Sequence, residues 1–108
     1  MKRLTALELG ERLRSGETSV VCVTRRRAPS SDDVLRRLEA ATSRVQLELL
    51  TIDADDAEVA PLLPDLGIDV LPAVLVLSGG VVIEQVNVVR DGVDARRIVA
   101  LATGERRV

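Results

Sequence analysis

The chain contains no phenylalanine, tyrosine, tryptophan or histidine among its 108 residues. Aromatic side chains usually dominate protein cores and binding anchors, so this core must be built from Val, Leu, Ile and Ala. The same absence leaves no aromatic ring on which a nucleic-acid base could stack. Without histidine there is no imidazole for acid–base catalysis, and a zinc site would have to consist almost wholly of carboxylates.

Cysteine is almost absent as well, because Cys22 is the only one. Disulfide exchange needs one thiolate to attack and a second thiol to resolve the mixed disulfide, and this chain cannot supply both. Cys22 lies between Val21 and Val23 in an apolar run, and free cysteine is among the most buried residue types. We expect an inert core thiol. The alternative is a redox protein in which Cys22 works with a partner's thiol.

The chain has neither a large excess charge nor a long apolar run. Fifteen basic and seventeen acidic side chains give a formal net charge of −2. A nucleic-acid-binding protein normally carries a net basic face, so we expect no nucleic-acid partner. No apolar run approaches the roughly 20 residues that cross a bilayer, so we expect no membrane segment and a cytoplasmic location. The composition is typical of a single globular domain over residues 1–108.

Two capping boxes and several β-branched runs predict alternating helices and strands. Thr5 with Glu8, and Ser30 with Asp33, have the spacing at which a helix N-terminus is capped reciprocally. Gly79 and Gly80 are typical of a hairpin turn. The predicted elements are a helix over 5–14, a strand over 19–24, a loop over 25–31, a helix to about residue 42, a strand over 45–52, a short helix over 55–63, strands over 73–77 and 81–89, a helix over 91–102 and a frayed tail over 104–108.

One segment resembles a known family. Residues 67–80 begin Gly67-Ile68-Asp69-Val70-Leu71-Pro72-Ala73, which is similar to the Gly-Ile-x-x-Ile-Pro-Thr stretch of thioredoxins. The strand and glycine turn that follow are similar too. The resemblance implies a three-layer α/β/α thioredoxin-like fold, with a central mixed sheet of four or five strands. It also implies a cis peptide bond before Pro72, which costs little only before proline.

The chain departs from this family at the residues that carry its chemistry. The Cys-Gly-Pro-Cys motif would fall on residues 27–30 or 28–31, and neither register contains a cysteine. Cys22 instead lies in the preceding strand, near the position of the family's buried acid. The family's catalytic residues therefore transfer to no position here, and we expect no enzyme activity and no cofactor.

What remains is a shape that could bind another protein or peptide. We expect a redox-inactive adaptor or chaperone-like accessory that docks an extended peptide by backbone pairing and a shallow apolar patch. A homodimer is the alternative use of such a patch, and a purely structural or designed domain without ligand is the remaining alternative. The predicted dock, with the neighbouring Val89, consists of Arg27, Ala28, Pro29, Ser30, Ser31, Leu71, Pro72 and Val88.

Two charged clusters admit a further interpretation each. Arg25, Arg26 and Arg27 precede a helix start and could form an anion pocket, although ion pairs with Asp32 and Asp33 explain them more simply. The acidic residues over 53–58 could hold a hard cation, but they lack the glycine-punctuated spacing of a calcium loop. Carboxylates at a helix start are explained by capping, so we expect no metal.

Overall fold

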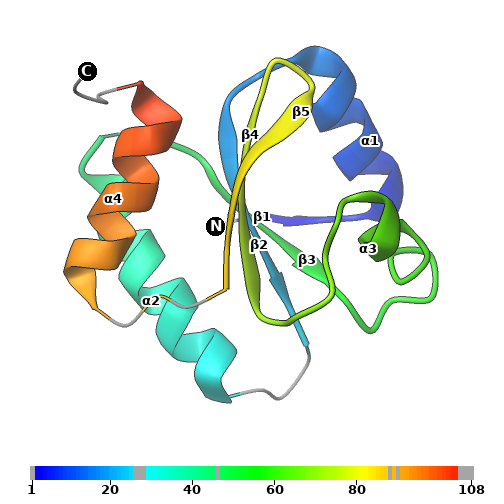
Figure 1. Ribbon diagram of the computed structural model, residues 1–108, viewed down its shortest axis with the longest axis horizontal. Helices are drawn as coiled ribbons and strands as arrows, with labels where there is room; N and C mark the ends of the chain where they lie inside the picture. The colour runs from blue at the N-terminus through cyan, green and yellow to red at the C-terminus, as the bar shows by residue number, and fades with distance from the viewer. Residues whose placement is uncertain (1, 26–28, 46, 88, 90, 105–108) are drawn as a thin grey trace.

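Five strands form one mixed sheet in the order β1-β3-β2-β4-β5 (Figure 1). β1, β3 and β2 run parallel, whereas β4 pairs antiparallel with β2 and with β5. The structure is a computed structural model and describes residues 2–25, 29–45, 47–87, 89 and 91–104. The strands are β1 (Lys2–Leu4), β2 (Ser19–Thr24), β3 (Leu49–Asp53), β4 (Ala73–Ser78) and β5 (Val81–Val86).

Helices cover both faces of this sheet. α1 (Ala6–Ser15) and α3 (Leu62–Asp65) lie on one face, and α2 (Pro29–Ser43) and α4 (Gly92–Thr103) lie on the other (Figure 1). Each pair of helices packs on the sheet through its own cluster of buried apolar side chains. The predicted three-layer α/β/α arrangement is therefore confirmed. No helix in the described part of the chain is both long and apolar enough to span a bilayer.

The central strand β2 shows how the sequence specifies the two cores. Val20 and Cys22 belong to the cluster beneath α2 and α4, whereas Val21 and Val23 belong to the cluster beneath α1. Successive strand residues face opposite sides of a sheet, so an uninterrupted apolar run fits only a strand that is covered on both faces. All four side chains are fully buried, as that pattern predicts.

The capping box predicted for α1 is present. The Thr5 hydroxyl accepts a hydrogen bond from the Glu8 N–H, and the Glu8 carboxylate accepts one from the Thr5 N–H, each at 3.1 Å. The hydrogen bond from the Thr5 backbone, followed by that from Lys2, lowers the pKa of the Glu8 carboxyl. At its other end the helix stops at Gly16, whose φ of 73° suits glycine.

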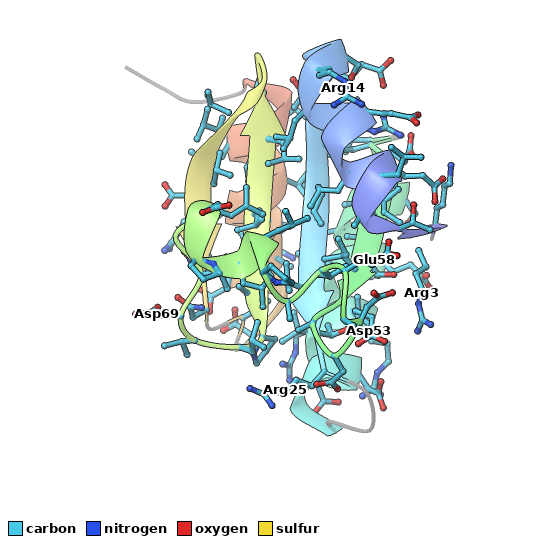
Figure 2. The ribbon with its side chains drawn as sticks, turned by 90° about the vertical axis from the view of Figure 1, so that its right-hand side faces the viewer. Arg3, Arg14, Arg25, Asp53, Glu58 and Asp69 are labelled. Carbon is cyan, nitrogen blue, oxygen red and sulfur yellow. The ribbon has the colours of Figure 1, made fainter. Side chains whose placement is uncertain are left out.

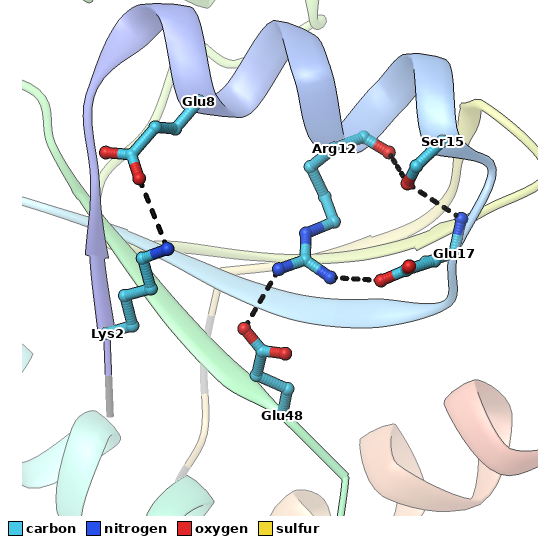
Figure 3. A network of polar contacts seen from close by, with 6 residues as sticks. All are labelled: Lys2, Glu8, Arg12, Ser15, Glu17 and Glu48. Atoms are coloured by element: carbon cyan, nitrogen blue, oxygen red, sulfur yellow. Dashed lines mark hydrogen bonds and ion pairs between the residues drawn. The ribbon is translucent and has the colours of Figure 1, made fainter.

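Ion pairs join α1 to β1 and to the residues that precede β2 and β3 (Figure 3). The Arg12 guanidinium contacts the Glu17 carboxylate at 2.5 Å and the Glu48 carboxylate at 2.9 Å. Lys2 contacts Glu8 at 3.2 Å. Exposed ion pairs contribute about 0–1 kcal/mol each, so the network orients α1 more than it stabilises the fold.

Several predicted boundaries were wrong. Residues 2–4 form β1, a three-residue strand too short to show any periodicity. β3 begins at Leu49 rather than at residue 45, because the N–H groups of Val45 and Leu47 both bond the Thr42 carbonyl at the end of α2. β5 ends at Val86 rather than at residue 89, and a bulge interrupts its pairing near Val76 and Leu77.

The predicted helix over 55–63 is replaced by turns and the short α3. The Asp53 carboxylate accepts a hydrogen bond from the Asp55 N–H, and the Asp56 carboxylate accepts one from the Glu58 N–H. Such local side-chain bonds compete with helical backbone bonds. The α2 boundary also differs, because the helix begins at Pro29. Ser30 therefore lies inside the first turn and is not the predicted cap, whereas proline suits the first helical position.

Candidate functional site

Cys22 lies at the centre of the sheet, paired with Thr51 of β3 on one side and Val74 of β4 on the other. Its side chain is fully buried in the apolar cluster beneath α2 and α4. Burial raises the pKa of the thiol from its ordinary value of 9.0 to about 12. At neutral pH the sulfur is therefore a buried, protonated thiol, and the predicted burial of this cysteine is confirmed.

The turn before β4 and the chain that leaves β2 lie at one end of the sheet. The peptide bond between Leu71 and Pro72 is cis, as the resemblance implies. The antiparallel ladder between β2 and β4 ends, toward this turn, at the pair Val23 and Ala73, directly after Pro72. Figure 2 shows Arg25, Asp53 and Asp69 at this end of the molecule, and Arg14 at the opposite end. The end of β2 therefore lies beside the cis-proline turn.

Four of the predicted site residues lie outside the described part of the chain: Arg26, Arg27, Ala28 and Val88. The backbone of residues 29–31 forms the first turn of α2, which begins at the same end of the sheet where β2 finishes. The described part of the predicted dock is thus the cis-proline turn and the start of α2.

Val89, predicted beside the dock, is a core residue instead. Its side chain is buried in the cluster beneath α2 and α4. Its carbonyl accepts a hydrogen bond from the Arg37 guanidinium of α2 at 2.8 Å. This hydrogen bond holds the segment between β5 and α4 against α2. Because the Val89 side chain is buried, it is not available to contact a partner.

The sequence analysis missed Asn87, which lies directly after β5. Its side-chain amide donates to the Val70 carbonyl at 2.8 Å and to the Pro72 carbonyl at 3.3 Å. These two carbonyls flank Leu71, so Asn87 ties the cis-proline turn to the edge of the sheet. No local pattern in the sequence could have revealed this contact, because it joins segments 15 and 17 residues apart. Val70 beside it is an exposed apolar side chain.

The proposed anion pocket has one described member. Arg25 is exposed and makes no ion pair with any other described residue. The predicted pairing of the loop arginines with Asp33 was wrong for Arg25, because Asp33 pairs with Arg36 one turn along α2. Arg25 is consequently a solvent-exposed side chain directly after β2.

The acidic residues over 53–58 are organised as turns. Asp53 is buried at the end of β3, whereas Asp55, Asp56 and Glu58 are exposed. Two of these carboxylates accept the local backbone hydrogen bonds described above. Within the described ranges no three Asp, Glu or Cys side chains come close enough to hold a metal ion.

No family model matches this sequence, and no curated protein matches it in sequence. Its fold is nevertheless similar to solved thioredoxins. Plasmodium falciparum thioredoxin is 15% identical, with 94% of this chain and 98% of that chain covered and a TM-score of 0.79. Thioredoxin f2, in its complex with ferredoxin:thioredoxin reductase, is 16% identical over 98% of this chain and 94% of its own, with a TM-score of 0.78.

Thioredoxin O2 from Arabidopsis thaliana in its oxidised state is 14% identical, with 97% of this chain and 93% of that chain covered and a TM-score of 0.74. Coverage is nearly complete in both directions, so the likeness extends to the whole architecture. The chain is therefore a thioredoxin-like domain by fold, and its sequence lacks the Cys-x-x-Cys pair.

Proposed function

We propose that this protein binds another polypeptide as an adaptor or chaperone-like accessory and carries out no dithiol chemistry. The observation that carries the proposal is the position of Cys22, the only cysteine, with its fully buried thiol and a pKa of about 12. A nucleophilic cysteine needs an exposed site that lowers its pKa, and Cys22 has the opposite surroundings. The thioredoxin architecture without its thiols leaves binding as the activity that the surface can support.

The cis-proline turn is the surface that we assign to binding. The main-chain N–H and C=O of Leu71 make no hydrogen bond with other described residues. An extended peptide could pair with them as a strand pairs with a sheet edge. Val70 beside them has 54% of its surface exposed and would provide an apolar contact. Thioredoxin f2 was solved in complex with a protein partner, which supports protein binding by this fold.

The proposal includes a cytoplasmic location, because an unpaired cysteine suits a reducing compartment. A second copy of the chain is the competing occupant of the turn. Sedimentation velocity over a range of protein concentrations separates the two cases, since we expect a monomer that binds an added polypeptide. Concentration-dependent dimerisation that shifts the Leu71 resonance would favour the homodimer.

Insulin reduction in the presence of dithiothreitol tests the absence of dithiol chemistry. We expect the protein to leave the background rate unchanged, and the Cys22→Ser variant to behave identically. Acceleration that disappears in Cys22→Ser would contradict the proposal and favour a redox protein that uses this thiol. A thioredoxin with its paired cysteines serves as the positive control.

A further inference from the structure

Asn87 makes two hydrogen bonds that tie the cis-proline turn to the end of β5, and Gln85 of β5 makes a third, farther back, to the Gly67 carbonyl. One amide group donates to the carbonyls of Val70 and Pro72, at 2.8 and 3.3 Å. The regular ladder between β4 and β5 ends at the pair Val74 and Val86, one residue before this point. Beyond the last backbone pair of β4 and β5, the Asn87 side chain therefore supplies the hydrogen bonds that join the end of β5 to the turn.

These contacts decide which main-chain groups of the turn remain available. The carbonyls of Val70 and Pro72 both accept from Asn87, and Pro72 has no N–H. Leu71, between them, keeps a donor and an acceptor that no described residue uses. The residue before a proline favours extended backbone, in which its N–H and C=O point to the same side, so those of Leu71 could pair with one residue of an added strand.

Resting on the proposed function, we propose that Asn87 is a positioning residue for partner binding. It fixes the two carbonyls that flank Leu71 and so presents the main chain of Leu71 as the pairing position for an extended polypeptide. Preorganisation of this kind raises affinity, because the turn loses little conformational freedom when the partner binds. Asn87 itself makes no contact with the partner in this arrangement.

The test uses the carboxymethylated B chain of insulin, a short polypeptide without free thiols, as the probe. Binding to the full chain is followed by the shift of the Leu71 amide resonance in ¹H–¹⁵N NMR spectra. The variants are Asn87→Ala, which removes the amide, and Asn87→Asp, which keeps its size but has no donor when ionised. We expect the dissociation constant to rise about fivefold to tenfold in both, the effect of losing one or two hydrogen bonds.

Val82→Ala is the matched control, because Val82 packs on the α1 side of the sheet and pairs with Leu77, near the hairpin end of β5. It lowers stability without changing the turn. All measurements are made at a temperature at which circular dichroism shows each variant to be folded. We expect Val82→Ala to keep the wild-type dissociation constant, so that a loss in the Asn87 variants reports the turn and not general destabilisation.

The outcomes separate this inference from the function on which it rests. If the probe leaves Leu71 unperturbed in the wild-type protein, the proposed peptide dock is wrong. If the probe perturbs Leu71 and both Asn87 variants bind as tightly as the wild type, the dock stands and the role of Asn87 is refuted. Equal weakening by Val82→Ala would also refute it, because the effect would then follow stability alone.

Discussion

The Gly79 N–H donates a hydrogen bond of 3.1 Å to the Gly16 carbonyl, which joins the β4–β5 hairpin to the end of α1. Gly80, the next residue, lies so close to α1 that an added Cβ would be 3.0 Å from the Leu13 carbonyl oxygen. The hairpin and the helix terminus therefore pack backbone against backbone. Both glycines of the turn have positive φ, which the hairpin needs and side-chain-bearing residues resist.

Gly80→Ala should destabilise the fold by more than the cost of backbone conformation alone. Its φ of +85° costs about 1 kcal/mol for alanine, and the contact with Leu13 adds to that. Gly67→Ala is the control, because its φ is +75° and nothing lies within 4 Å of its added Cβ. Urea unfolding followed by circular dichroism measures both variants. Equal losses would show that the hairpin is not packed tightly on α1.

The buried Cys22 thiol should make stability fall in alkaline solution. Its pKa is about 12 in the folded protein and 9.0 ordinarily, so above pH 9 the unfolded chain loses the proton first. The contribution is fully present below pH 9 and is lost as the pH rises toward 12, with a slope of about 1.4 kcal/mol per pH unit at most. Urea unfolding at a series of pH values measures this slope.

Cys22→Ala isolates the effect of the thiol. The chain has no tyrosine, and Lys2 is its only lysine and is present in both proteins. We expect the alkaline loss of stability to be smaller in Cys22→Ala by the amount that the thiol contributes. A matching curve for the two proteins would mean that the thiol ionises as readily when folded as when unfolded, and that Cys22 is accessible.

Leu38→Ala should be among the most destabilising substitutions in α2. Leu38 is fully buried in the cluster beneath α2 and α4, so its truncation leaves a cavity there. Truncation of a buried leucine typically costs about 2–5 kcal/mol. Leu7→Ala in α1 is the matched control, with 68% of its surface exposed and an expected change within about 0.5 kcal/mol. Chemical denaturation of the two variants would contradict the packing if it gave similar losses.

Thr5→Ala should cost about 1 kcal/mol, because it leaves the Glu8 N–H without its capping oxygen. Thr5→Ser keeps the hydroxyl and should retain most of the stability.

The Glu8 pKa is lowered in the folded protein, so the contribution of its carboxylate to stability is present at neutral pH and is lost as the pH falls through the folded-state pKa. NMR titration of the Glu8 carboxyl in the Lys2→Met variant should show a higher pKa than in the wild type. An unchanged value would exclude the Lys2 contact in solution.

Local sequence patterns predicted the strands that are buried on both faces and the helices whose capping residues lie next to them in the sequence. β2 is fully apolar from Val20 to Val23, and the Thr5–Glu8 box starts α1 where expected. Short elements and their boundaries were not predictable in this way. β1 is held by pairing with β3, some 48 residues along the chain, as in the pair Lys2 and Leu50. The bulge in β5 likewise depends on its partner β4.

In the candidate site, too, the features set by residue identity were predictable and those set by long-range contacts were not. The sequence alone determined that no cysteine pair exists, that the chain resembles thioredoxins around Pro72, and that Cys22 belongs to a buried strand. These conclusions need only residue identity and short-range pattern. Only the tertiary structure decided that Val89 is buried and that Asn87 bonds the cis-proline turn. Such contacts join segments far apart in the chain, and their geometry exists only once the sheet has set its register.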